Sequence, residues 1–141
     1  MVYLESIRYN RRIVLRHVVS GQRVPMELTS LGRAYLAVAP EAKQKALLNM
    51  FKRRRGNQWE PIGRAIEDAR KSVSERGYCA AAWQPEVVAL ATPLVTPDAI
   101  YVLNVSVSTD ESLTSVVREL CKPLMDLKRN IQKILDAGLP P

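Results

Sequence analysis

Residues 78–108 read YCAAAWQPEVVALATPLVTPDAIYVLNVSVS, and this stretch decides the fold. Its β-branched and aromatic residues gather in three short runs, at 78–83, 86–94 and 99–108. Proline-bearing turns separate the runs, at Gln84-Pro85 and at Thr96-Pro97-Asp98. Short runs of this composition joined by tight turns predict a three-stranded antiparallel meander.

The sequence before this meander predicts three successive helices. They are expected over 29–38, 40–56 and 60–76, where apolar residues recur at three- and four-residue spacing. Thr29 or Ser30 can cap the first helix, Pro40 suits the first turn of the second, and Gly77 suits the end of the third. Met50 is expected among the inward-facing residues of the second helix.

A fourth and longest helix is expected after the meander. Thr109 or Asp110 can cap it, and apolar residues follow at helical spacing over 113–135. Pro123 lies inside this helix and has no backbone N–H. We therefore expect a kink or a break in the hydrogen bonding near Glu119.

The first residues predict a β-hairpin. Runs at 2–8 and 12–19 are rich in β-branched and aromatic residues, and 9–11 is short enough to connect them. The complete order is therefore ββ-ααα-βββ-α. Strands and helices that do not alternate strictly indicate an α+β domain, in which helices flank a mostly antiparallel sheet.

Length and composition favour one globular domain. The chain has 141 residues, of which 47% are hydrophobic and 25% charged. No apolar run approaches the roughly 18 residues of a membrane span, and the N-terminus lacks the apolar core of a signal peptide. We therefore expect a cytoplasmic protein without membrane contact. Cys79 and Cys121 have neither metal-ligand nor redox spacing, so we expect two reduced thiols, no metal and no cofactor.

The chain is basic, with 21 Lys and Arg against 14 Asp and Glu and a net charge of +7. Lys52, Arg53, Arg54 and Arg55 form a run directly before Gly56. Cations in the last turn of a helix interact favourably with its dipole, and this explanation is preferred. A nucleic-acid-binding module that uses the run is the alternative, although no aromatic residues alternate with the charges.

The sequence offers little for catalysis. His17 is the only histidine, and no partner residue is singled out for it. The glycine-containing signatures of hydrolases, of dinucleotide-binding folds and of phosphate-binding loops are absent. We therefore expect no catalytic residues, and a small-molecule enzyme is the least favoured alternative.

Two strands carry candidate pocket walls. Alternation along 100–108 places Ser106 and Ser108 on one face, whose other residues turn polar toward the strand end. Small uncharged polar groups suit a ligand pocket, but an ordinary solvent-facing side of the sheet explains them equally well. Ala81 and Trp83 offer a second wall, because the small alanine side chain leaves room and the indole ring supplies a flat apolar surface. Packing of both residues under a helix is the somewhat better explanation.

Several stretches together resemble the IclR-type bacterial transcriptional regulators. Residues 18–37, VVSGQRVPMELTSLGRAYLA, resemble the family signature G-x-R-x-P-x-H-x-T-x-x-G-K-A-x-L-A. The similarity continues through ERGY at 75–78, VALATPL at 88–94 and VSVS at 105–108. The order and spacing agree over nearly the whole chain.

The resemblance implies a GAF/profilin-like fold and, over residues 1–141, the family's C-terminal effector-binding domain. In such regulators this domain binds a small metabolite and assembles into dimers or tetramers. An N-terminal winged helix-turn-helix domain reads operator DNA in the family. That domain is missing from this sequence, so we expect the effector to modulate DNA binding only through it.

The resemblance also implies effector-binding positions. Ser30, Leu31 and Gly32 match the turn whose backbone amides face the effector, where a helix N-terminus suits a carboxylate. Further pocket positions match Ala89, Ser106 and Ser108. With Ala81 and Trp83 these residues make up the candidate site.

Departures from the family pattern indicate the kind of effector. Glu27 replaces the family's histidine, and the uncharged residues 79–84 replace an acidic stretch. The pocket should therefore be less acidic and more apolar than in members that bind small hydrophilic acids. We expect a small organic acid with an aromatic or aliphatic body.

Overall fold

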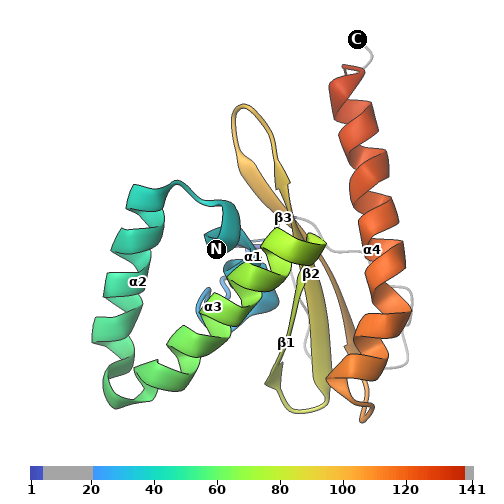
Figure 1. Ribbon diagram of the computed structural model, residues 1–141. Coiled ribbons are helices and arrows are strands. Elements are labelled where there is room, and N and C mark those ends of the chain that lie inside the picture. The colour runs from blue at the N-terminus through green and yellow to red at the C-terminus, as the bar shows by residue number, and fades with distance from the viewer. Residues whose placement is uncertain (5–20, 139–141) are drawn as a thin grey trace.

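The sheet of this domain lies between helices on both of its faces (Figure 1). The structure, a computed structural model, describes residues 1–4 and 21–138. Within them the elements are α1 (Ser30–Val38), α2 (Glu41–Arg55), a 3-10 turn (Gly56–Gln58), α3 (Trp59–Arg76), β1 (Cys79–Gln84), β2 (Val87–Val95), β3 (Ile100–Ser108) and α4 (Leu113–Asp136). This order confirms the predicted three helices, three strands and final long helix, and with them the α+β class.

Most of the predicted N-terminal hairpin lies outside the described residues. His17 also lies outside them. Of the hairpin, the structure describes residues 2–4. The backbone N–H of Tyr3 donates to the carbonyl of Gln22 at 3.0 Å, and the N–H of Gly21 donates to the carbonyl of Tyr3 at 2.7 Å. The first residues of the chain therefore lie antiparallel to residues 21–24.

The described strands form an antiparallel sheet in the order β1-β2-β3. Alternate side chains point to opposite faces of a sheet. The face of Leu90 packs against α4, and the face of Ala91 packs against α1 and α3. We call the face of Ala91 the α1 face.

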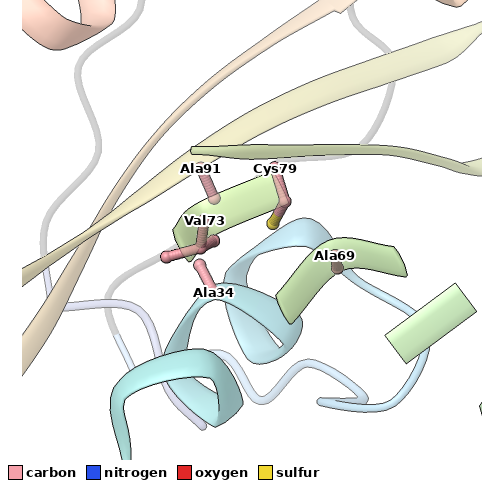
Figure 2. Close-up of a cluster of buried hydrophobic side chains, with 5 residues drawn as sticks. All are labelled: Ala34, Ala69, Val73, Cys79 and Ala91. Carbon is pink, nitrogen blue, oxygen red and sulfur yellow. The ribbon is translucent and has the colours of Figure 1, made fainter. Parts of the chain in front are cut away.

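Small side chains bring α1 and α3 close to this face. Figure 2 shows one buried cluster formed by Ala34 of α1, Ala69 and Val73 of α3, Cys79 of β1 and Ala91 of β2. Alanine presents only a methyl group, so the helix backbones can approach the sheet closely. Because protein interiors are close-packed, added volume in this layer would displace a helix.

Larger side chains fill the opposite face, under α4. Val88 and Leu90 of β2 pack against Val116 and Leu124 of α4. Partly buried residues of β3 join them from the predicted apolar side of that strand, namely Leu103, Val105 and Val107. The predicted alternation along β3 is thereby confirmed.

Helix α2 packs on the other helices through a third cluster, centred on Leu36, Phe51 and Ile66. Met50 was expected to face inward, but it is exposed, so this expectation was wrong. Neighbouring positions on a helix point about 100° apart. Phe51 takes the inward direction and turns Met50 toward solvent.

Helix α4 begins later than predicted. Its N-cap is Ser112, whose hydroxyl accepts from the N–H of Ser115 at 3.2 Å. Thr109 instead accepts from the N–H of Glu111 at 3.0 Å and so closes the preceding turn. The helix continues through Pro123 to its end, so the proline removes a backbone donor without ending the helix.

None of the helices in residues 1–4 and 21–138 is long and apolar enough to cross a membrane. The same residues hold no group of three or more His, Cys, Asp or Glu side chains placed to share a metal ion. Cys79 and Cys121 are both free thiols, as expected from their spacing.

Candidate effector-binding site

Three of the predicted site residues form one row across the α1 face. Ala81 of β1 pairs with Ala89 of β2, and Ala89 pairs with Ser106 of β3. Directly opposed residues of antiparallel strands point to the same face. We call Ala81, Ala89 and Ser106 the cross-strand row. Two methyl groups beside one hydroxyl make a small, mainly apolar floor with a polar end.

Ser108 and Asn104 extend the polar end of the row along β3. Each lies two residues from Ser106 and therefore shares its face. The phenol of Tyr3 forms a hydrogen bond with the Asn104 side chain, and burial raises the pKa of this phenol. Sequence reasoning missed Tyr3, because only the folded sheet brings residue 3 beside residue 104.

Burial changes along the row. Ala81 and Ala89 are only 5% and 8% exposed, whereas Ser106 and Ser108 are exposed. The row is thus closed at its methyl end and open at its hydroxyl end. No charged side chain lies on this face of the described strands.

A β-bulge separates Trp83 from the row. The register of β1 against β2 shifts between Ala81 and Gln84. A bulge interrupts the two-residue alternation that would place Trp83 on the face of Ala81. Trp83 is 38% exposed. The wall expected from Ala81 and Trp83 together rested on that alternation, and the structure does not bring the two side chains onto one regular face.

The N-terminus of α1 is tied to the sheet beside the row. Cys79, two residues before Ala81 on β1, donates from its sulfur to the carbonyl of Ser30 at 3.4 Å. The hydroxyl of Thr29 caps the helix, accepting from the N–H of Gly32 at 3.2 Å. The amides of Ser30 and Leu31 belong to the same first turn, where N–H groups lack a partner within the helix, and the cap leaves them available.

Burial keeps the Cys79 thiol protonated. It raises the pKa of Cys79 to about 12, and the positive charge of Arg33 opposes this shift without cancelling it. Burial likewise lowers the pKa of Arg33. At neutral pH Cys79 is therefore a hydrogen-bond donor to Ser30 and a poor nucleophile.

Gly32 allows the turn before α1 to press against the helix. A Cβ at this position would lie 2.1 Å from the carbonyl oxygen of Met26. No side chain fits at such a distance. The glycine is therefore explained by packing alone, and its predicted role in effector binding would act through the position of the turn.

Glu27 anchors the same turn from the other side. Its side chain is completely buried, and its Oε1 accepts from Arg55 Nε at 3.0 Å and from Arg55 Nη2 at 2.7 Å. Arg33 Nε donates to the backbone carbonyl of Glu27 at 3.1 Å. Glu27, and with it the segment that leads into Ser30 and Leu31, is thus held by Arg33 of α1 and by Arg55 at the C-terminal end of α2.

The basic run of α2 is therefore divided between two roles. Arg55 is committed to the buried pair, and the exposed Arg54 lies 3.9 Å from the same Glu27 oxygen, whereas Lys52 and Arg53 are exposed and turned to solvent. Helix α2 ends directly after the run, as the preferred explanation required. The interaction of these cations with the helix end explains the basic run without any binding of nucleic acid.

Two hollows stand out on the surface of the described residues, and the cross-strand row lies in neither. One of about 580 Å³ lies at the junction of α2 and α3, beside Lys52, Trp59 and Arg64. The other, of about 380 Å³, lies along the outer edge of β1.

Comparison with known proteins finds similar solved structures over nearly the whole chain. No protein-family model matches the sequence, and no curated protein matches it. The structure is similar to that of an IclR family transcriptional regulator from Brucella abortus, with 25% identity and a TM-score of 0.84. This match covers 99% of the chain described here and 53% of the regulator.

Two further solved structures hold small aromatic acids. One is the inducer-binding domain of the PobR transcription factor from Acinetobacter, a double mutant in complex with 3-hydroxybenzoic acid. Its identity is 19% and its TM-score 0.65, over 89% of this chain and 75% of that one. The other is an IclR homologue from Microbacterium hydrocarbonoxydans complexed with 4-hydroxybenzoate, with 18% identity and a TM-score of 0.70 over 91% and 53% of the two chains.

The chain therefore has the same α+β fold as these solved domains. Its structural neighbours are IclR-family transcriptional regulators, and the resemblance indicated by the sequence motifs is confirmed. The chain spans about half the length of the Brucella and Microbacterium proteins.

Proposed function

We propose that this chain is the effector-sensing domain of an IclR-type transcriptional regulator, and that its effector is a small carboxylate with an aromatic or aliphatic body. The observation that carries the proposal is the cross-strand row beside the first turn of α1. It joins an uncharged floor to backbone amides that suit an anion. Complexes of two structural neighbours with hydroxybenzoates support this class of ligand.

Each part of the site has a separate task in this proposal. The amides of Ser30 and Leu31 receive the carboxylate at the positive end of the helix dipole. The buried methyl groups of Ala81 and Ala89 form the apolar closed end of the row, against which the apolar body lies when it enters from the open end at Ser106. Ser106 and Ser108 donate to or accept from polar substituents of the effector.

Regulation follows from linkage between effector binding and assembly. An effector that favours one arrangement of the subunits shifts the population toward it, and attached DNA-binding domains are respaced against the operator. We propose that operator DNA is bound by a winged helix-turn-helix outside residues 1–141, and that these residues form dimers or tetramers. Exposed apolar side chains on α4, namely Leu127, Ile134 and Leu135, are consistent with self-association.

A thermal-shift comparison tests the ligand class. We expect 4-hydroxybenzoate to raise the melting temperature and the uncharged 4-hydroxybenzamide to leave it unchanged. At a hundred times its dissociation constant a ligand adds about 2.7 kcal/mol to stability, which corresponds to several degrees for a domain of this size. Ser106→Ala with Ser108→Ala should reduce the shift. Ser74→Ala, an exposed serine on α3, is the matched control.

Two results would contradict the proposal. One is the absence of a shift with every aromatic and aliphatic carboxylate tested. The other is an equal shift with the acid and with the amide, because the amides of α1 would then have no part in recognition.

A further inference from the structure

A cleft of about 380 Å³ runs along the outer edge of β1, and none of the cross-strand row residues lines it. Its walls come from α1, from α3, from β1 with the residue before it, and from the N-terminal end of α4. They include Arg33, Asp68, Arg76, Tyr78, Leu113 and Thr114. We call it the β1-edge cleft. Its volume falls within the range of roughly 300 to 1,000 Å³ that is usual for small-molecule sites.

The charged side chains of this cleft carry an excess of one positive charge. Arg33 and Arg76 are cations and Asp68 is an anion. Among the described residues none of the three forms an ion pair. Arg33 is half-buried, and burial is the main cause that lowers its pKa. Arg33 donates from its Nε to the Glu27 carbonyl at 3.1 Å, but no carboxylate among the described residues balances its charge, so an anion that enters the cleft stabilises it.

Neighbouring groups hold Arg76 in place beside the cleft. Its Nη2 donates to the hydroxyl of Ser72 at 3.0 Å, and that hydroxyl donates to the carbonyl of Tyr78 at 2.6 Å. The guanidinium also lies over the Tyr78 ring, 5.7 Å from its centroid. Arg76 therefore loses less side-chain freedom on binding an anion than a solvated arginine would.

The first turn of α4 contributes a second positive element. Ser112 caps this 24-residue helix by accepting from the N–H of Ser115. Leu113 and Thr114 of the first turn line the cleft. The N-terminus of a helix favours negative charge. Apolar side chains complete the walls, among them Ala65 and Val117.

We propose that the β1-edge cleft binds a small, singly charged organic carboxylate. Its charged group lies between Arg76 and the first turn of α4, and its apolar body lies against Ala65 and Val117. One negative charge balances the excess of the cleft. The site is distinct from the proposed effector site, which lies on the α1 face at Ala81, and it does not depend on that proposal.

A fluorine NMR titration with 4-fluorobenzoate tests the site. The Ser106→Ala, Ser108→Ala double variant serves as the background, so that binding at the cross-strand row is weakened first. In this background we expect saturable binding, which Arg76→Gln weakens about tenfold through the loss of a charge-assisted contact. Lys71→Gln removes the same charge from an exposed position of the same helix and should change nothing.

A second variant tests the apolar wall. Ala65→Leu places a larger side chain in the cleft at a half-buried helix position and should weaken binding as strongly as Arg76→Gln. If Ala65→Leu lowers the melting temperature of the free protein, its weaker binding could come from a loss of folding. The comparison of Arg76→Gln with Lys71→Gln then decides whether the cleft binds the acid. If the double variant shows no saturable binding of 4-fluorobenzoate, the inference is overturned. Binding that neither Arg76→Gln nor Ala65→Leu weakens overturns it as well. Neither result bears on the serine-dependent thermal shift predicted above.

Discussion

Arg55 donates two hydrogen bonds to one oxygen of Glu27, across 28 positions of sequence. The Glu27 side chain is completely buried, and its second oxygen, Oε2, has no hydrogen-bond partner. This pair connects the end of α2 to the turn that presents the first amides of α1. The candidate site therefore depends on a contact outside it.

Removal of Arg55 should destabilise the domain. Arg55→Ala removes both hydrogen bonds to Glu27 Oε1 and leaves the buried carboxylate with only the exposed Arg54 guanidinium, 3.9 Å away. We expect a loss of about 3 kcal/mol in the free energy of unfolding. Arg53→Ala, an exposed neighbour, should change it by less than about 0.5 kcal/mol. Urea denaturation measures both. Equal effects of the two variants would show that the pair does not hold the turn.

A methyl group at residue 32 should displace the turn. Gly32→Ala puts a Cβ against the Met26 carbonyl, a backbone atom that cannot swing away, and we expect a loss of about 2 kcal/mol or more together with weaker effector binding. Gly63→Ala is the matched control within a helix. Its Cβ would meet the Trp59 side chain at 3.1 Å, which can shift slightly. The account fails at this point if both variants are equally stable.

The two cysteines should differ in reactivity. Cys79 is buried and its pKa is raised to about 12, whereas Cys121 is only half-buried. Iodoacetamide at pH 8 should therefore modify Cys121 first in the native protein, as mass spectrometry of peptides would show. Alkylation of Cys79 at the same rate would contradict its burial.

The same thiol predicts a loss of stability at alkaline pH. Between pH 9 and about 12 the unfolded chain releases the Cys79 proton while the folded chain retains it. The unfolded state then binds fewer protons, so the free energy of unfolding falls as the pH rises through this window. Cys79→Ala should flatten this part of the stability profile, and an unchanged slope would exclude Cys79 as its source.

Helix α4 should contribute to stability through one side only. Leu124 is buried against β2 and the neighbouring residues, so Leu124→Ala should cost about 2 to 5 kcal/mol. Leu127 is 49% exposed, and Leu127→Ala should cost much less. If the exposed side mediates self-association, Leu127→Ala should instead lower the molar mass measured by light scattering at a given concentration.

Local patterns predicted the elements well, because a run of strand-forming residues or a helical stripe is contained within each element. Ser112 replaced the expected cap of α4 because Thr109 is used in the preceding turn, a choice that depends on backbone angles. The bulge before Gln84 left no sequence signal, and it moved Trp83 out of the alternation.

The candidate site was predictable only in part. Ala89 was assigned through the family resemblance, and Ser106 through both the strand alternation and the resemblance. Strand pairing then placed both in one row with Ala81. The Tyr3 contact with Asn104 and the Arg55 contact with Glu27 join residues far apart in the sequence. Contacts of this kind depend on how the elements pack, which periodicity does not encode.

The most direct test of the effector-sensing account is an NMR titration of the nitrogen-15-labelled chain with 4-hydroxybenzoate. The account predicts saturable shifts that are largest for the amides of Ser30, Leu31 and Ser106. Shifts confined to Arg76 and Thr114 of the β1-edge cleft, or the absence of any saturable shift, would contradict it.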